Sequence, residues 1–306
     1  MSPSNALASM AVIDRLLAPN SIFQRRFFFL AKRFVAGESI DSAIAAVRAL
    51  NADGLSATLD FLGEDTTDLR EAERTRDTYL EMLGAIADSG VRSNVSVKLT
   101  ALGLLVDEQR CAELLGDIIE RAQPLSDPFV RIDMEGSAVT EATLRVFERA
   151  YAQSKNVGPV IQAYLKRSPG DVERAIALGA RVRLCKGAYS EPETVAIHDM
   201  PSIRLAYARM AQALLLRGNY PGIATHDKRL IDAVKAYTAE SGIGTERFEF
   251  QMLFGLRPAL QRTLAREGYN MRVYVPFGTH WAGYFYRRIT ERKENAFFVL
   301  RSLVAR

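Results

Sequence analysis

Residues 129–164 read FVRIDMEGSAVTEATLRVFERAYAQSKNVGPVIQAY, and this stretch decides the fold class. It opens and closes with short apolar runs, Phe129–Met134 and Pro159–Tyr164, which have the length of buried strands. Between them, Glu141–Ser154 carries apolar residues at helical spacing. A strand, a helix and a second strand in this order indicate a βαβ unit, in which the two strands lie parallel.

The same alternation continues through the chain from residue 55 onward. Strand-like runs are predicted at Leu55–Leu62, Asn94–Leu99, Phe129–Met134, Pro159–Tyr164, Arg181–Cys185, Gly222–Thr225, Phe248–Leu253 and Met271–Val275. The amphipathic stretches that follow them are Leu69–Ala87, Glu108–Ala122, Glu141–Ser154, Asp171–Leu178, Ile203–Leu216, Arg229–Ala239, Arg257–Arg266 and Trp281–Leu303. A series of eight βα units most commonly closes into a (βα)8 barrel of the TIM type, whereas a doubly wound α/β sheet needs no particular number of units.

The chain before the first strand-like run has helical patterns only, at Leu7–Leu17, Phe23–Val35 and Ile40–Leu50. No stretch rich in glycine, serine or proline divides the part that follows. We therefore expect an N-terminal helical extension over residues 1–50 and a catalytic barrel over residues 51–306.

Composition places the protein among globular proteins and narrows its partners. The 306 residues carry a formal charge of +4, from 40 basic and 36 acidic side chains. This small excess, without a basic patch rich in aromatic residues, argues against nucleic acid as a partner. Cys111 and Cys185 lie far apart and form no CxxC pair, which is typical of a reduced cytosolic compartment. We find no signal peptide and no apolar run long enough to span a bilayer.

The carboxyl ends of barrel strands hold the chemistry in this fold, and most of the predicted strands end in polar residues. These residues are Lys98, Asp133, Glu135, Gln162, Arg183, Lys186, Thr225, His226, Gln251 and Tyr274. A barrel strand is buried on both faces, so each polar group needs a partner or a ligand. A structural hydrogen bond explains any single case well, but the whole set predicts a large, polar and mainly cationic pocket.

Arg287-Arg288 lies on the last predicted helix and is a candidate anion clamp. Two guanidiniums about 100° apart on a helix can flank one small carboxylate, and Glu291 follows at the spacing that can hold either of them. The alternative is a solvated helix face. If the pair is a clamp, the substrate is a small carboxylate.

A second ligand fits the other half of the predicted pocket. Lys186-Gly187-Ala188 and Thr225-His226 are suited to a phosphate-bearing cofactor, since Gly187 allows close approach of the backbone. His226 is equally consistent with a ligand role and with a structural pair with Asp227. The chain has no GxGxxG, GxxxxGK[ST], GxSxG or HExxH motif, and its three histidines are widely separated, so we expect no metal site.

Six segments, taken together and in order, closely resemble the proline dehydrogenase family. They are Val97-Lys98-Leu99-Thr100, Arg131-Ile132-Asp133-Met134-Glu135, Arg183-Leu184-Cys185-Lys186-Gly187-Ala188-Tyr189, Ala224-Thr225-His226, Phe250-Gln251-Met252-Leu253 and Tyr286-Arg287-Arg288-Ile289-Thr290-Glu291. The resemblance implies a monofunctional bacterial form with a distorted (βα)8 barrel, whose last helix lies over the pocket. It also implies a non-covalent FAD that is bound without a Rossmann unit.

The resemblance assigns roles to individual residues of this chain. Substrate-binding roles fall to Lys98, Leu253, Tyr274, Arg287, Arg288 and Glu291. Cofactor-binding roles fall to Met134, Gln162, Arg183, Lys186, Gly187, Ala188, Thr225 and His226. Arg183 is expected to reach the flavin N5 region and Asp133 to support the cationic site, so these two are the expected catalytic residues.

The implied reaction is the first step of proline catabolism to glutamate. A hydride passes from C5 of L-proline to flavin N5, giving Δ1-pyrroline-5-carboxylate, and a quinone-type acceptor then takes the electrons. The implied location is cytoplasmic, and peripheral association with the inner face of the membrane stays open. Phe23–Val35 mixes phenylalanine with basic residues as an interfacial helix does, but a helix packed on the barrel is the favoured interpretation.

Two other functions also fit the residues. One is a different barrel enzyme, either a lyase that forms a Schiff base at Lys98 or another TIM-barrel flavoenzyme. The other is a non-catalytic module that binds a small carboxylate. The sequence decides neither the oligomeric state nor the preference for proline over hydroxyproline.

Overall fold

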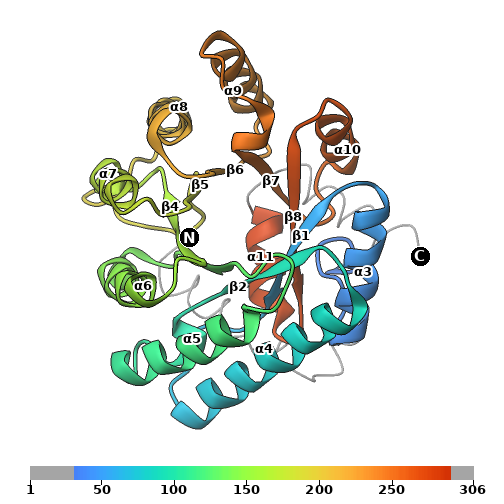
Figure 1. Cartoon of the computed structure of the whole chain (residues 1–306). Coiled ribbons are helices and arrows are strands. Elements are labelled where there is room, and N and C mark those ends of the chain that lie inside the picture. Colours follow the sequence, from blue (N-terminus) through green and yellow to red (C-terminus); the bar gives the residue numbers. More distant parts are fainter. Residues whose placement is uncertain (1–30, 291–306) are drawn as a thin grey trace.

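The computed structural model describes the backbone of residues 31–290 and the side chains of residues 31–285. Eight parallel strands close into a barrel in the order of the chain, with helices on the outside, which confirms the predicted TIM-type fold (Figure 1). The strands are β1 (Ser56–Phe61), β2 (Ser93–Val97), β3 (Val130–Ile132), β4 (Val157–Gln162), β5 (Arg183–Cys185), β6 (Gly222–Ala224), β7 (Glu249–Leu253) and β8 (Asn270–Phe277).

The helices form where amphipathic stretches were predicted. They are α3 (Ile40–Ala52), α4 (Leu69–Ser89), α5 (Glu108–Ala122), α6 (Thr140–Gln153), α7 (Ser168–Leu178), α8 (Met200–Arg217), α9 (Lys228–Glu240), α10 (Pro258–Arg266) and α11 (Trp281–Thr290). Four of them begin after an aspartate whose carboxylate accepts a hydrogen bond from the first turn, namely Asp68, Asp107, Asp199 and Asp227. Such capping residues explain why these helices start directly after their loops.

The interior of the barrel is polar, whereas the layer between the strands and the helices is apolar. Residues that pair in register point to the same side of a sheet, and Asp60, Ser96 and Arg131 pair in this way across β1, β2 and β3. The alternate residues, such as Val95 and Val97, are fully buried in the apolar layer. The strands therefore direct a column of polar side chains toward the barrel axis.

The last helix crosses the carboxyl end of the barrel, and α3 covers the outer wall at β1 and β8. Trp281 and Phe285 of α11 pack in one apolar cluster with Phe34, and Leu62 after β1 belongs to the same cluster. Tyr274 of β8 packs against this cluster as well. The described side chains of the last helix therefore pack at the carboxyl end of the barrel, and its position over the substrate pocket stays a prediction. The predicted helix Leu7–Leu17, most of Phe23–Val35 and the last part of Trp281–Leu303 lie outside the described residues.

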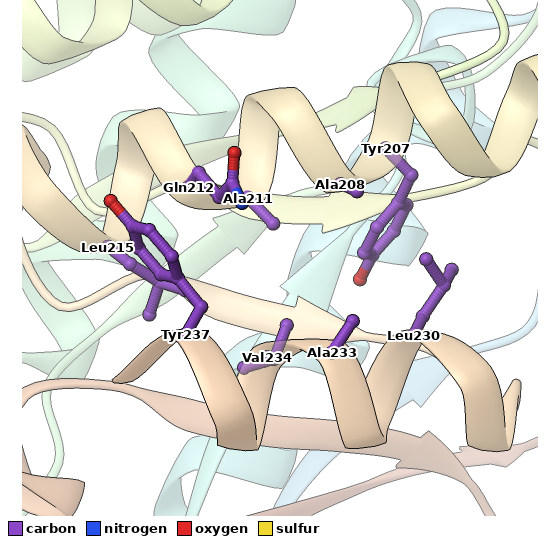
Figure 2. A pocket seen from close by; sticks show the side chains of 9 residues that line it. All are labelled: Tyr207, Ala208, Ala211, Gln212, Leu215, Leu230, Ala233, Val234 and Tyr237. Carbon is purple, nitrogen blue, oxygen red and sulfur yellow. The ribbon is translucent and has the colours of Figure 1, made fainter. Parts of the chain in front are cut away.

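Two hollows lie in the outer layer of helices, away from the carboxyl ends of the strands. Figure 2 shows the one between α8 and α9, which is lined mainly by alanine, leucine and tyrosine and has a volume of about 20 Å³. This volume is about that of one water molecule. The other is an open groove of about 610 Å³ between α5 and α6. Between residues 31 and 290, no helix is long and apolar enough to cross a membrane.

Candidate functional site

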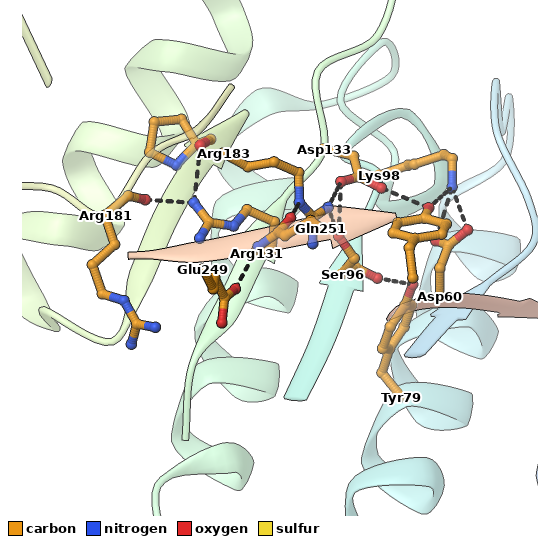
Figure 3. A network of polar contacts seen from close by, with 12 residues as sticks. Asp60, Tyr79, Ser96, Lys98, Arg131, Asp133, Arg181, Arg183, Glu249 and Gln251 are labelled. Carbon is orange, nitrogen blue, oxygen red and sulfur yellow. Dashed lines mark hydrogen bonds and ion pairs between the residues drawn. The ribbon is translucent and has the colours of Figure 1, made fainter. Parts of the chain in front are cut away.

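A buried ion pair joins β1 to the end of β2 at the carboxyl mouth of the barrel. The Lys98 ammonium lies 2.8 Å from each carboxylate oxygen of Asp60, and the Asp60 side chain has no exposed surface (Figure 3). Burial lowers the pKa of Lys98, but Asp60 and then Asp133 outweigh it, so the pKa is raised. Burial also raises the pKa of Asp60, although Lys98 lowers it, so the shift at the carboxyl group opposes ionisation while the shift at the lysine favours it. We favour the ionised pair on the geometry, because both carboxylate oxygens accept from one ammonium.

A second ion pair, between Arg183 and Asp133, lies beside the first. Arg183 Nη1 donates to Asp133 Oδ1 at 2.8 Å and to Ser96 Oγ at 3.0 Å. The hydroxyl of Tyr274 donates to Asp133 Oδ2 at 2.8 Å and lies 3.4 Å from Lys98 Nζ. Burial, followed by Asp133 and Asp60, raises the pKa of Tyr274 well above its usual range, so it remains a neutral phenol. Tyr274 thus bridges the two ion pairs.

The three nitrogens of the Arg183 guanidinium differ in their hydrogen-bond partners. Nε donates to Gln251 Oε1, and Nη1 is taken up by Ser96 and Asp133. Among the side chains that the structure describes, none accepts from Arg183 Nη2. Arg183 as a residue is only 6% exposed, and Nη2 is the guanidinium nitrogen that is available to a polar ligand.

The charge of the mouth differs from the predicted cationic excess. Asp60 balances Lys98, and Asp133 balances Arg183, so the described charges at this end cancel. The predicted excess of positive charge is therefore absent among the described residues of this part of the pocket, because Asp60, which the prediction left out, pairs with Lys98. Any excess of positive charge here depends on Arg287 and Arg288, whose side chains lie outside the described residues.

A separate charged cluster lies where β5 and β6 end. Asp227 Oδ2 accepts from Lys186 Nζ and from Arg204 Nε, each at 2.7 Å. Burial raises the pKa of Asp227, but the hydrogen bonds from Lys186 and Arg204 outweigh it and lower the pKa to about 2. Two cations share one carboxylate, so the cluster keeps one net positive charge, which suits a phosphate.

Neighbouring groups fix the loops around this cluster. Thr225 Oγ1 accepts from the Asp227 amide at 3.1 Å. His226 Nε2 accepts from the Leu253 amide at 2.9 Å, so the histidine ties β6 to the end of β7. This hydrogen bond gives His226 a structural partner other than Asp227, while its ligand role stays a prediction.

The loop after β5 approaches β4 closely at Gly187. Gly187 has a φ of +115°, and a Cβ atom at this position would lie 2.1 Å from the Tyr164 ring. Only glycine therefore fits here, which is why the Lys186-Gly187-Ala188 backbone can lie directly on the barrel. Ala188 itself is exposed.

Buried polar groups also lie at the ends of β3 and β4, at the same end of the barrel. Gln162 Nε2 donates to the Glu135 carbonyl at 2.9 Å, and Met134 beside it is buried. The Glu135 carboxylate accepts from the amide and the hydroxyl of Thr100. Burial nevertheless raises the pKa of Glu135 to about 7.

The structure therefore brings most of the predicted residues to one end of the barrel, in two groups. Lys98, Asp133, Arg183 and Tyr274 are joined by hydrogen bonds, and Leu253 lies at the end of β7 beside α11. Met134, Gln162, Lys186, Gly187, Ala188, Thr225 and His226 lie at the ends of β3 to β6 or in the loops that follow. Arg287 and Arg288 lie on α11, but their side chains lie outside the described residues, as does the whole of Glu291.

Sequence reasoning missed two residues of this site. Asp60 lies in a run that reads as apolar, and its signal is a charged residue one position before the end of the first strand. Arg204 lies on α8 and has no local signal, because only the fold brings it to Asp227. In the described part of the chain, no group of three histidine, cysteine or acidic residues could hold a metal ion.

Comparison with known families and proteins gives a consistent result. Residues 43–301 match the family model described as "Proline dehydrogenase". The chain is 42% identical over 274 residues to "Proline dehydrogenase 1" of Bacillus subtilis (strain 168), with 90% of each chain covered. It is 41% identical over 288 residues to "Proline dehydrogenase" of Deinococcus radiodurans, with 92% of each covered.

Solved structures with the same fold include a longer protein. The crystal structure of proline utilization A (PutA) from Bdellovibrio bacteriovorus, inactivated by N-propargylglycine, superposes with a TM-score of 0.79 at 28% sequence identity. The match covers 87% of this chain and 33% of that one, so this chain spans about a third of the length of that PutA.

Proposed function

The chain belongs to the proline dehydrogenase family, and from this premise we propose how its barrel mouth carries out the reaction. It is an oxidoreductase of proline catabolism. The proposed reaction converts L-proline to Δ1-pyrroline-5-carboxylate at the mouth lined by Lys98, Arg183 and Tyr274. The observation that carries this proposal is the buried Arg183 guanidinium, whose Nη1 is held by Asp133 and Ser96 while no described side chain accepts from Nη2.

The family is flavin-dependent, and we propose non-covalent FAD as the cofactor. The donor set fits this group. Lys186 and Arg204 offer one net positive charge for its phosphates, and Gly187 lets the backbone approach without a side chain in the way. Thr225, His226, Met134, Gln162 and Ala188 are the further residues that we assign to this half of the mouth.

When bound, the flavin supplies a two-electron oxidant for the C5–H bond of proline. The other contributions come from the chain itself. Arg287, Arg288 and Lys98 bind the carboxylate and so fix the proline ring, which is mainly an orientation effect. Leu253 and Tyr274 pack beside the ring, and Glu291 orients the two arginines. Arg183, held by Asp133, favours negative charge that develops on the oxidant.

The ion pair at Lys98 argues against a Schiff-base lyase. A lysine nucleophile has to lose its proton, and a lowered pKa is the usual means. Here Asp60 binds the ammonium through both oxygens, and the pKa of Lys98 is raised. We therefore favour the oxidoreductase over the lyase and over a silent carboxylate-binding module.

The visible spectrum of the purified protein tests the proposal. We expect a yellow protein whose flavin absorption is lost when L-proline is added without oxygen, and the bound nucleotide, released by heat, is expected to be FAD. A colourless protein, or a flavin that L-proline does not reduce, would refute it. A covalent adduct on Lys98 after treatment with a carbonyl substrate and borohydride, which reduces a Schiff base to a stable amine, would instead support the lyase.

We also propose that a quinone-type acceptor takes the electrons and that the protein contacts the membrane surface to reach it. Flotation with liposomes, with and without residues 1–36, tests the contact. Equal flotation of both forms would show that residues 1–36 do not make the proposed membrane contact.

A further inference from the structure

The Gln251 side chain joins the mouth of the barrel to a charged cluster deeper inside it. Gln251 Oε1 accepts from Arg183 Nε, and Gln251 Nε2 donates to Glu249 Oε1 (Figure 3). All three side chains are buried, and Gln251 is only 4% exposed. Figure 3 shows Gln251 lying between Arg183 and Glu249 in the barrel interior.

The chemistry of its two neighbours fixes the orientation of this amide. A guanidinium only donates, and an ionised carboxylate only accepts. The amide oxygen must therefore face Arg183 and the amide nitrogen must face Glu249, since the reversed amide would place donor against donor and acceptor against acceptor. Burial raises the pKa of Glu249, but Arg272 outweighs it and the pKa is lowered, so the carboxylate stays ionised.

The lower end of this chain of contacts is anchored to β8, to β1 and to the loop before β3. Arg272 of β8 donates from Nε to Glu249 at 2.8 Å and from Nη1 to the Ala57 carbonyl of β1 at 2.7 Å. Its Nη2 lies 2.9 Å from Asp127, which precedes β3. Gly222 of β6 leaves room for the amide, because a Cβ atom there would lie 2.4 Å from Gln251 Nε2.

We propose that Gln251 is a positioning residue, which holds the Arg183 guanidinium in the orientation that leaves Nη2 at the barrel mouth. The Glu249–Arg272 ion pair holds Gln251 in turn. Asp133 and Ser96 hold Nη1 from one side, so Gln251 supplies the second fixed point that a planar group needs against rotation. The inference rests on the proposed role of Arg183 toward the cofactor.

Gln251→Met tests the proposal with a side chain of similar length that has no amide. We expect the rate constant of flavin reduction by L-proline to fall at least about tenfold, while FAD stays bound and the KM for proline changes less than about twofold. The reduction potential of the flavin is expected to fall, because the positive charge is less well placed. Thr238→Val, at a buried position of α9, is the control; we expect it to leave the reduction rate, the KM for proline and the reduction potential unchanged.

Gln251→Glu separates positioning from packing. A protonated glutamic acid can still accept from Arg183 and donate to Glu249, whereas an ionised one places two carboxylates side by side. The ionisable groups around this position are Arg183 on β5, Glu249 on β7, Arg272 on β8, Arg131 and Asp133 at β3, and Arg181 and Tyr220 near Glu249. We expect reduction close to the wild-type rate at about pH 6 and a loss of rate toward about pH 9 that the wild type does not show. A ratio of the two reduction rates, variant to wild type, that does not change with pH would overturn the proposal.

The double variant Arg183→Met/Gln251→Met distinguishes the inference from its premise. If Gln251 acts only through Arg183, Gln251→Met slows flavin reduction in the wild type but has no further effect beside Arg183→Met. Additive effects would overturn the positioning role. A normal rate in Arg183→Met alone would instead refute the proposed role of Arg183.

Discussion

Asp60→Asn removes the charge of a buried carboxylate and leaves the shape of the side chain nearly unchanged. Asp60 has no exposed surface, and its carboxylate is 2.8 Å from the Lys98 ammonium at both oxygens. The variant therefore leaves Lys98, which is 7% exposed, as a buried cation without its main counter-ion.

The loss of stability can be bounded from these contacts. Removing one partner of a buried ion pair costs about 3–5 kcal/mol. The asparagine oxygen can still accept from Lys98, and Asp133 also raises the pKa of Lys98, so we expect about 3 kcal/mol. For a domain of this size that corresponds to a fall in Tm of roughly 6–12 °C.

Thermal and urea unfolding of the cofactor-saturated protein, followed by circular dichroism, measures this loss. Asp53→Asn is the matched control, because Asp53 is exposed and its nearest contact with Arg262 is 3.5 Å. We expect this control to change the free energy of unfolding by less than about 0.5 kcal/mol.

The double variant Asp60→Asn/Lys98→Met removes the unpaired charge as well. We expect it to be more stable than Asp60→Asn alone by at least about 1 kcal/mol. A loss below about 1 kcal/mol in Asp60→Asn, or a double variant that is no more stable, would refute an ionised and buried pair.

Three further predictions concern the rest of the site. Burial raises the pKa of Glu135 to about 7, so the contribution of this group to stability is full below its ordinary pKa of 4.5 and is lost as the pH rises through about 7. Urea unfolding at low and neutral pH should show the wild type losing stability relative to Glu135→Gln between these two values. Parallel pH profiles of the two proteins would contradict this prediction. Gly187→Ala places a Cβ atom against the Tyr164 ring and should weaken FAD binding at least about tenfold in a fluorescence titration, whereas Gly242→Ala, at a φ of +64° and with open space around it, should not. Arg288→Met should raise the KM for proline by about two orders of magnitude while FAD stays bound, and a near-normal KM would exclude the carboxylate clamp.

The fold could be predicted from the sequence because its signals are local. Apolar runs such as Phe129–Met134 have strand length wherever they occur, and the amphipathic stretch after each one repeats at helical spacing. Eight such units leave few ways to bury the strands, and the closed barrel is one of them. The same reasoning placed Lys98 at the carboxyl end of its strand, whereas Arg183 is the first residue of β5 and Tyr274 lies inside β8.

The pairing of charges could not be predicted in this way. Closure of the barrel places β1 between β2 and β8, and only this arrangement brings Asp60 to Lys98 and Tyr274 to Asp133. Two ion pairs therefore lie where the sequence alone suggested an excess of positive charge. Likewise, Arg204 is 23 residues from Asp227 in the chain and reaches it only because α8 packs against α9, which begins directly after Asp227.

The sequence by itself determined the barrel, the family and the end of the barrel that carries the polar residues, because strand length, helical spacing and motif order are read along the chain. The tertiary structure alone decided which donor meets which acceptor, as in the contact of Gln251 with both Arg183 and Glu249. Hydrogen bonds and ion pairs act over a few ångströms through space, and residues from five different strands come within that range only when the barrel has closed.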